Sequence, residues 1–253
     1  MKKITQQDMK ELFDITQSEN REDGIRYGPA SLHRRRIIKE FAKNISFNSI
    51  ADIGCGNGNF LKYLLKKLNK DESMINITGI DIAPKAIDKA REKLNGDFFI
   101  MDISKNKIDA KFDLVICSEV LEHIVDYKNA LKNISEICIK NLILSTPCGP
   151  FGDHPGSMIR YYPKKKLISY LNKVGFQVVK CKRWGFPFFT PIHEVIIHSL
   201  GIKKNPLRTG KFGIVKKILS KILYYIFYLN IPDKGDRIFI LATKDKLLPR
   251  EKI

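Results

Sequence analysis

The sequence lacks the features that mark several special classes of protein. Its five cysteines, at positions 55, 117, 138, 148 and 181, are odd in number and form no C-x-x-C pair, which argues against a disulfide framework or a cysteine-based zinc site. The N-terminal residues MKKITQQDMKELF include no apolar segment like that of a secretory signal. The longest apolar run near the C-terminus, Ile222–Leu229, is far shorter than the ~20 residues of a membrane-spanning helix. We therefore expect a soluble, cytoplasmic protein.

Acidic residues are scarce relative to basic ones. The chain has 27 Asp and Glu residues against 45 Lys and Arg residues, which gives a formal net charge of +18. Such a charge can attract nucleic acid, anionic lipid or a phosphorylated substrate. Because lysine is spread along the whole chain, a solvated surface in a composition biased toward lysine and isoleucine explains the charge equally well. The net charge alone therefore does not indicate which class of partner the protein binds.

Signals for strands and helices alternate through most of the chain. Strands are expected over residues 48–53, 75–82, 98–103, 112–118, 141–146, 176–182 and 236–243. Helices are expected between them over residues 59–68, 84–94, 127–138 and 163–174, and before them over Thr5–Ser18 and Pro29–Asn44. Alternating strands and helices predict an α/β fold with a mostly parallel sheet, flanked by helices that make right-handed crossovers.

The length of 253 residues suits one domain with elaborations. We expect an N-terminal helical cap over residues 1–45 and a cofactor-binding core over residues 46–183. A helical insertion over residues 184–232 precedes the last strand and tail, residues 233–253. The insertion is expected on the rim of the sheet that faces the ligand, because such sheets bind ligands outside the carboxyl ends of their strands.

A glycine-rich turn after the first strand is the most informative segment. The strand Ile50–Ile53 leads directly into Gly54-Cys55-Gly56-Asn57-Gly58, and a helix begins at Asn59. Glycines allow a tight turn and let a ligand approach the backbone. The G-x-G-x-G spacing differs from the G-x-G-x-x-G of dinucleotide sites. Asp52, at the end of the strand, would repel a pyrophosphate and suits a cationic ligand that carries a sulfonium and an amino group.

Acidic residues also end the next two strands. Asp81 lies 23 residues beyond Gly58, and Asp102 follows the apolar segment Phe98–Met101. Asp81 can accept hydrogen bonds from both hydroxyls of a ribose, and Asp102 can accept one from the exocyclic amine of an adenine. Three acids at three successive strand ends therefore favour a shared nucleoside.

These motifs together resemble those of a known family. Asp52–Gly58, Asp81, Asp102 and Phe112–Glu119 are similar, in their order, to the motifs of class I S-adenosylmethionine-dependent methyltransferases. The run SEVLEHI at Ser118–Ile124 resembles the motif after strand four in the small-molecule branch that includes the ubiquinone-biosynthesis methyltransferases. The resemblance implies a Rossmann-like fold with a seven-stranded sheet, and S-adenosylmethionine as cofactor.

The resemblance also implies a role for each motif residue. It places the cofactor's methionine portion on the glycine loop, its ribose on Asp81, its adenine on Asp102 and its sulfonium beside the motif after strand four. The cofactor-binding residues implied in this way are Asp52, Gly54, Cys55, Gly56, Gly58, Asp81, Ile82, Asp102, Ile103, Ser118 and Glu119. Asp52 is expected near the amino group of the cofactor, and Ile82 against its adenine.

Methyl transfer from a sulfonium is an in-line displacement that needs no enzyme nucleophile, although a hydroxyl acceptor usually needs a base. His123, beyond the fourth strand, and His154, after the fifth, are the candidate catalytic residues; Glu122 is a further candidate base. Each histidine could instead make only local contacts. Glu119, Glu122, His123 and His154 could together bind a divalent metal, but the same motif is frequent in the family without one, so no metal is expected.

The insertion contains two segments that each suit two roles. The aromatic run Trp184–Phe189 suits either a wall of an acceptor pocket or core packing. In residues 211–229, Val215, Ile218, Leu219, Ile222, Leu223 and Ile226 follow helical spacing, with lysines off that stripe. Such a basic amphipathic helix suits peripheral contact with the inner face of a membrane. Alternatively, the stripe packs on the domain as a lid.

The sequence thus predicts a methyltransferase for a small-molecule acceptor, such as a lipid or glycan precursor. RNA methylation is an alternative that the charge encourages, but the chain has no RNA-binding module and no N-P-P-Y-type motif, so a nucleic-acid partner is not expected. A second alternative is a membrane-associated protein that binds the cofactor without catalysis.

Overall fold

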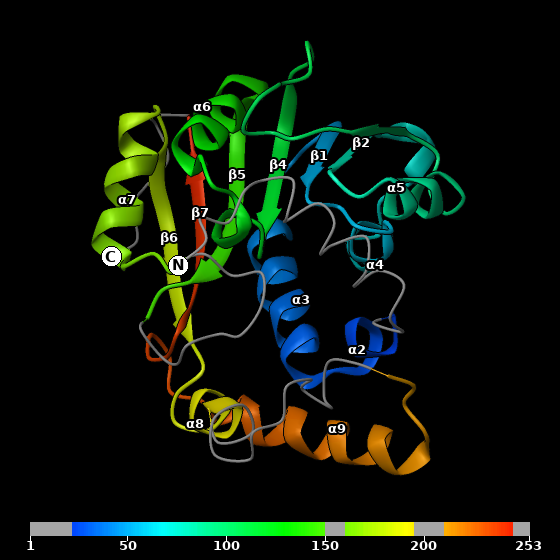
Figure 1. Ribbon diagram of the computed structural model, residues 1–253, viewed down its shortest axis with the longest axis vertical. Coiled ribbons are helices and arrows are strands. Elements are labelled where there is room, and N and C mark those ends of the chain that lie inside the picture. Colours follow the sequence, from blue (N-terminus) through cyan, green and yellow to red (C-terminus); the bar gives the residue numbers. More distant parts are fainter. Residues whose placement is uncertain (1–21, 150–159, 195–209, 245–253) are drawn as a thin grey trace, which may run out of the picture.

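A seven-stranded sheet forms the centre of the molecule. The computed structural model describes residues 22–149, 160–194 and 210–244. The strands are β1 (Ser49–Ile53), β2 (Asn76–Asp81), β3 (Asp97–Ile100), β4 (Phe112–Ser118), β5 (Cys138–Pro147), β6 (Gln177–Trp184) and β7 (Arg237–Thr243). Their order is β3-β2-β1-β4-β5-β7-β6, and β7 alone among them runs antiparallel to its neighbours (Figure 1). The predicted Rossmann-like, mostly parallel sheet is confirmed.

Helices cover both faces of the sheet. The α-helices are α2 (Glu22–Tyr27), α3 (Pro29–Ala42), α4 (Asn59–Lys67), α5 (Pro84–Arg91), α6 (Tyr127–Ile137), α7 (Lys164–Lys173), α8 (Phe189–Glu194) and α9 (Ile214–Tyr228); η1 (Glu72–Met74) and η2 (Leu121–His123) are single 3₁₀ turns. Buried side chains of α6 and α7 pack on one face of the sheet. Those of α3, α4 and α5 pack on the other. The predicted helix Thr5–Ser18 lies outside the described residues.

The third strand is shorter than the sequence predicts. We expected it over residues 98–103, but β3 ends at Ile100 and the chain then turns at Asp102. The Asp102 Oδ1 atom accepts hydrogen bonds from the backbone N–H of Ser104 at 2.9 Å and from its hydroxyl at 2.7 Å. Such an aspartate turn competes with strand geometry. The strand therefore ends at Ile100, although the Met101 N–H still donates to the carbonyl of Asp81 at 2.9 Å.

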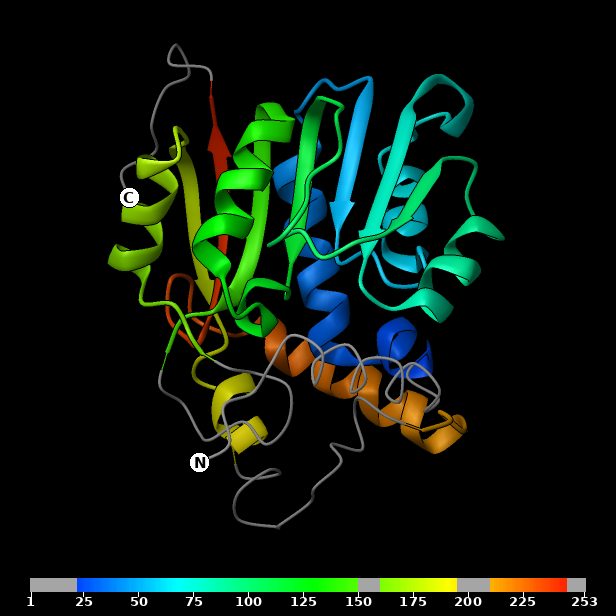
Figure 2. The ribbon, with the colours of Figure 1, turned by 45° about the horizontal axis from the view of Figure 1, so that its top comes forward.

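The described parts of the segment between β6 and β7, residues 185–194 and 210–236, fold against the helices at the carboxyl ends of the parallel strands. The Trp184 ring is buried and stacks on Phe189, with ring centroids 4.7 Å apart. Both rings also contact Phe227 of α9, and Phe186 is exposed. Of the two roles that the sequence suggested for this aromatic run, Trp184 and Phe189 have the second, core packing. Figure 2 shows α9 lying across the ends of α2 and α3, beyond the arrowheads of β1 and β2.

Candidate active site

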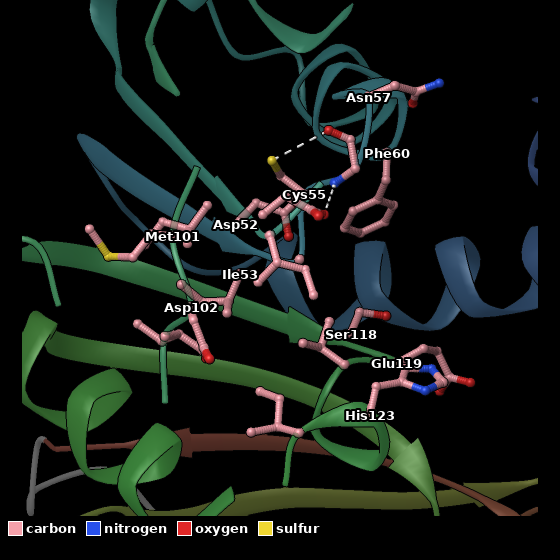
Figure 3. A pocket seen from close by; sticks show the side chains of 18 of the residues that line it. Asp52, Ile53, Cys55, Asn57, Phe60, Met101, Asp102, Ser118, Glu119 and His123 are labelled. Atoms are coloured by element: carbon pink, nitrogen blue, oxygen red, sulfur yellow. Dashed lines mark hydrogen bonds between the residues drawn. The ribbon is translucent and has the colours of Figure 1, made fainter. Parts of the chain in front are cut away.

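A pocket lies at the carboxyl ends of β1, β2 and β4, where the sequence places its motifs. The strand ends, the turns after them and the two helices before β1 all contribute to its walls. The lining residues are Ile25, Arg34, Asp52–Asn57, Phe60, Ile80–Ile82, Met101–Ile103, Ser118–Val120, His123 and Ile124. In Figure 3, Met101 and Asp102 lie at one end of the view, and Glu119 and His123 at the other.

The glycine turn closes the end of β1 tightly. The backbone N–H groups of Gly54 and Cys55 both donate to the carbonyl of Ile80, at 2.7 and 3.1 Å. Gly54 has φ of +70°, and a Cβ placed on it would lie 2.3 Å from the Cγ2 atom of Val120. A larger residue at this position would therefore be strained by both backbone conformation and contact. Cys55 lines the same wall, and burial raises the pKa of its thiol.

Gly58 has a different position from the first two glycines. It begins α4 with φ of +73°, and an added Cβ would contact Leu94 and Ala90 at 3.3–3.4 Å. The pocket walls include Gly54 and Gly56 but not Gly58. Gly58 therefore lets α4 start close to the α5 segment, and its predicted contact with a cofactor remains a prediction.

The three acidic residues at the strand ends all line this pocket, but they differ in their burial and in their hydrogen-bond partners. Asp52 is buried, and burial together with the negative charge of Asp81 raises the pKa of Asp52 to about 8. The Asp81 carboxylate accepts hydrogen bonds from the backbone N–H groups of Gly56 at 2.8 Å and Ala83 at 2.9 Å. The Asp102 Oδ2 atom is buried and has no hydrogen-bond partner. A buried carboxylate oxygen without a donor is costly, so Asp102 is ready to accept one from a ligand.

Arg34 was missed by the sequence analysis. It comes from α3 and lines the pocket near Asp52, whose pKa its positive charge lowers against the effect of burial. Ile25 of α2 lines the same side. The periodicity of Pro29–Asn44 predicted the helix, but it identified only the apolar face that packs on the domain. Among 45 basic residues, nothing in the sequence singles out Arg34, since its significance comes from where α3 meets β1.

At the other end of the pocket, Ser118 and Glu119 belong to a polar network. The Ser118 and Ser145 hydroxyls lie 2.8 Å apart, and the Ser145 hydroxyl donates to Glu119 Oε1 at 3.2 Å. Arg237, at the start of β7, places its Nε atom 3.6 Å from Glu119 Oε2. Glu119 has φ of +58°, which turns the chain sharply after β4. The protein's own groups therefore already bind this carboxylate.

Two neighbours in η2 have opposite surroundings. Glu122 is buried, and its Oε2 atom accepts a hydrogen bond from the Thr146 hydroxyl at 3.0 Å. Burial and the charge of Glu119 raise the pKa of Glu122 to about 8. His123 lines the pocket, and its Nε2 atom lies 3.9 Å from Glu122 Oε1. His123 therefore lines the pocket, whereas Glu122 is buried and does not line it.

Arg237 is a second residue that the sequence analysis missed. Its guanidinium is buried and lies 3.3 Å from Asp236 Oδ2, in addition to its contact with Glu119. Burial lowers the pKa of Arg237, but the carboxylates of Asp236, Glu119 and Glu122 outweigh that effect and raise it. The expected metal-free site is untested, although within the described residues no group of three metal-ligating side chains converges. His154 lies outside those residues, so its predicted catalytic role remains a prediction.

Comparison with known proteins establishes the family. A methyltransferase-domain family model matches residues 26–181, more than half of the chain. The ubiquinone biosynthesis O-methyltransferase of Coxiella burnetii is 32% identical over 94 residues, which cover 35% of this chain and 38% of that protein. The malonyl-[acyl-carrier protein] O-methyltransferase of Acetivibrio thermocellus is 37% identical over 76 residues, 29% of this chain and 25% of that protein. The chain thus matches well under half the length of these relatives.

The fold has matches among solved structures as well. The N-methyltransferase NodS from Bradyrhizobium japonicum WM9, in complex with S-adenosyl-L-homocysteine, superposes with a TM-score of 0.59 at 13% identity. The superposition covers 93% of this chain and 97% of NodS. The chain belongs to the class I S-adenosylmethionine-dependent methyltransferase family, as its motifs predict. None of the helices in the described part has the length and apolar character needed to cross a bilayer.

Proposed function

We propose that this protein transfers the methyl group of S-adenosylmethionine to a small-molecule acceptor. The observation that carries the proposal is the polarity of the pocket. The Asp52 carboxyl and the Arg34 guanidinium lie in the same part of the pocket, and the unpartnered Asp102 oxygen lies in the same pocket beyond the β1 turn. The cofactor has a matching order of groups, because its zwitterionic amino acid end and its adenine amine are separated by a ribose.

The lining residues fit the cofactor group by group. Asp52 would hold the ammonium and Arg34 the carboxylate, with the Gly54–Gly56 backbone beside the methionine chain. Asp81 would accept the ribose hydroxyls, since each carboxylate oxygen can accept more than one hydrogen bond. Asp102 Oδ2 would accept the adenine amine. Apolar residues that line the pocket, Ile82, Met101 and Ile103, would enclose the adenine ring.

The reaction needs positioning and one proton acceptor. A lone pair of the acceptor forms a bond to the methyl carbon as the carbon–sulfur bond breaks, and the electron pair of that bond stays on sulfur. Ser118 and Glu119 would flank the sulfonium, and His123 would take the proton from a hydroxyl acceptor. Glu122, 3.9 Å behind His123, would orient its ring as a positioning residue.

The acceptor is proposed to be a small molecule, with lipid and glycan precursors as the favoured classes. The two curated relatives are named for O-methylation of a ubiquinone precursor and of a malonyl group on a carrier protein, and both suit an oxygen nucleophile. RNA methylation and cofactor binding without catalysis are the competing functions. Labelled S-adenosylmethionine, incubated with the protein and with lipid, polyol and RNA fractions, separates the three by where the label goes.

The His123→Gln variant tests the chemistry. Glutamine keeps a polar side chain of similar reach but cannot take up a proton, so kcat should fall by about 10²–10⁴-fold. The affinity for S-adenosylhomocysteine, measured by calorimetry, should stay within about twofold, because His123 has no assigned cofactor contact. Imidazole in the buffer should restore part of the activity of His123→Ala.

Two results would contradict the proposal at different levels. Full activity of His123→Gln would remove the assigned base and leave the enzyme class intact. Absence of any binding of S-adenosylmethionine or S-adenosylhomocysteine to the folded wild-type protein would remove the function itself.

A further inference from the structure

The helix α9 has two unlike faces. Its inner face, where Ser220 and Phe227 are buried, packs against α2 and α3. The Ser220 hydroxyl donates to the carbonyl of Tyr27. His33 of α3 places its Nε2 atom 2.8 Å from the carbonyl of Tyr224, and the two rings stack with centroids 4.4 Å apart. Several specific contacts therefore fix which way the helix is turned.

The opposite face is apolar and exposed along the whole helix. We call the outer stripe the seven residues Ile214, Val215, Ile218, Leu219, Ile222, Tyr225 and Leu229, which are between 47% and 81% exposed. Of the six residues whose spacing suited a lid, Leu223 and Ile226 pack on the core of the domain, and the other four belong to the outer stripe. Single exposed apolar residues are ordinary, but a contiguous row of seven marks a binding surface.

The charges around the outer stripe indicate what binds there. Lys217 and Lys221 are exposed one turn apart along one border of the stripe, and Lys211 is exposed before its N-terminal end. Lys216 is half-buried, and its Nζ atom lies 4.0 Å from the centroid of the Phe212 ring. Residues 211–229 contain no aspartate or glutamate. Tyr225 and Tyr228 are also exposed, and tyrosine prefers the interface between lipid and water. A second protein could cover an apolar row, but two exposed lysines beside it and the lack of acidic residues in this segment suit a surface of anionic headgroups.

We propose that the outer stripe docks the protein on an anionic lipid bilayer, with α9 lying in the plane of the interface. A helix of this kind buries its apolar face at the boundary between headgroups and acyl chains, while lysines contact the headgroups. The helix belongs to the pocket side of the molecule: α2 and α3, on which it packs, supply Ile25 and Arg34 to the pocket (Figure 2). A docked molecule therefore holds its site next to the bilayer.

This placement narrows the acceptor class, a step that depends on the proposed function. An acceptor with a lipid anchor could reach the pocket from the bilayer without entering water. The docking itself does not depend on methyl transfer and can be measured without it.

Vesicle binding tests the docking surface. We expect the full-length protein to float with vesicles of phosphatidylglycerol and phosphatidylcholine, and to bind pure phosphatidylcholine far more weakly. The double variant Ile218→Glu/Ile222→Glu should lower the partition coefficient by roughly 100-fold, because two apolar side chains at the centre of the stripe become charged. Lys217→Gln and Lys221→Gln should each lower it about fivefold on anionic vesicles.

A matched control uses apolar residues that are as exposed but lie elsewhere. Met74 and Ile139 are 77% and 48% exposed, and neither belongs to α9. The double variant Met74→Glu/Ile139→Glu should float like the wild type. Calorimetry with S-adenosylhomocysteine on the α9 variants should match the wild type, so that lost docking is distinguished from a damaged cofactor site.

Three results would overturn the proposal. The first is equal flotation of the wild type and Ile218→Glu/Ile222→Glu. The second is a wild-type dimer, seen by light scattering, that fails to bind vesicles and becomes monomeric in that variant, since a second copy then covers the stripe. The third is a monomer that binds no vesicles and in which the stripe resists chemical labelling, since another segment of the chain then covers it.

Discussion

The two halves of the rim both present carboxylates, but they use them differently. On the side of β1, β2 and β3, Asp52 lies against another negative charge, and Asp102 has a buried oxygen without a donor. On the side of β4, β5 and β7, Glu119 and Glu122 have serine and threonine donors and the buried Arg237. The first half leaves Asp52 and one oxygen of Asp102 for a ligand, although Asp81 accepts two backbone N–H groups, and the second half binds its acids internally.

The difference teaches how to distinguish binding acids from structural ones. An acid in a pocket is a candidate ligand-binding group when burial or like charge makes its ionised form costly in the free protein. Asp52 meets that condition through burial and Asp81. Glu122 also has a raised pKa, but it faces Arg237 and Thr146 and does not line the pocket. The protein partners of each acid decide its role better than its pKa does.

The largest predicted effect concerns the internally bound half. Replacing Arg237 with leucine leaves Glu119, Glu122 and Asp236 without their shared cation in a buried place. The free energy of unfolding should fall by about 3–5 kcal/mol, because a broken buried ion pair leaves uncompensated charge. Denaturant unfolding at pH 7.5 measures it. The loss should shrink at pH 5, where the orphaned carboxylates can take up protons.

A surface pair provides the control for Arg237→Leu. Lys132 is 67% exposed and lies 4.0 Å from Glu136, so Lys132→Gln should change the free energy of unfolding by less than about 0.5 kcal/mol. A loss in Arg237→Leu as small as in this control would mean that the second half of the rim holds its acids for a ligand too.

Most of the fold follows from the sequence because its signals are local. Glycine turns, proline helix starts and apolar runs predicted all seven strands, with errors at ends such as that of β3, but they did not predict the short helix α2. The exception at β3 has a physical cause, since Ser104 draws Asp102 into a turn that strand propensity does not include. The confirmed family also follows from motifs that lie within one strand and one turn each.

The parts of the site that the sequence could not predict depend on long-range packing. Arg34 reaches the pocket only because α3 crosses the end of β1, and Arg237 reaches Glu119 only because β7 inserts next to β5. The orientation of α9 is a similar case: with apolar residues on nearly every side, periodicity could not tell which face packs on α3. That choice depends on His33 and Tyr27, about 190 residues away in the chain.

Replacing Asp52 with asparagine should weaken cofactor binding but make the free protein more stable. Asp52→Asn should weaken S-adenosylmethionine binding by about 30-fold, or about 2 kcal/mol, because a charged hydrogen bond to the ammonium is lost. The free protein should become more stable at pH 7.5. Below about pH 4 the carboxyl is protonated in both states; above it the unfolded chain releases the proton while the folded protein keeps it up to about pH 8.

The raised pKa of Asp52 also determines how cofactor binding depends on pH. Since the raised pKa means that wild-type Asp52 must release a proton to attract the ammonium, affinity should rise with pH and level off above about 8. Calorimetry in buffers of different ionisation enthalpy should detect proton release for the wild type and much less for Asp52→Asn. Equal proton release by both proteins would place the amino group of the cofactor elsewhere.

The smallest predicted effect, on Asp102, is also the most specific. In Asp102→Asn the remaining oxygen is needed by Ser104, whose N–H and hydroxyl lie at 2.9 and 2.7 Å, so the new amide NH₂ takes the place of Oδ2. Two donors then face each other at the adenine amine, and affinity for S-adenosylhomocysteine should fall about tenfold, or about 1.4 kcal/mol.

The inosine analogue of S-adenosylhomocysteine, which carries a carbonyl oxygen in place of the adenine amine, turns that loss into a reversal of preference. The wild-type protein should bind the adenine compound more tightly, because its free carboxylate oxygen needs a donor. Asp102→Asn should bind the inosine compound more tightly, because its amide now supplies the donor. An unchanged preference for adenine in the variant would show that the unpartnered oxygen does not face the base, and the contrast between the two halves of the rim would then rest on Asp52 alone.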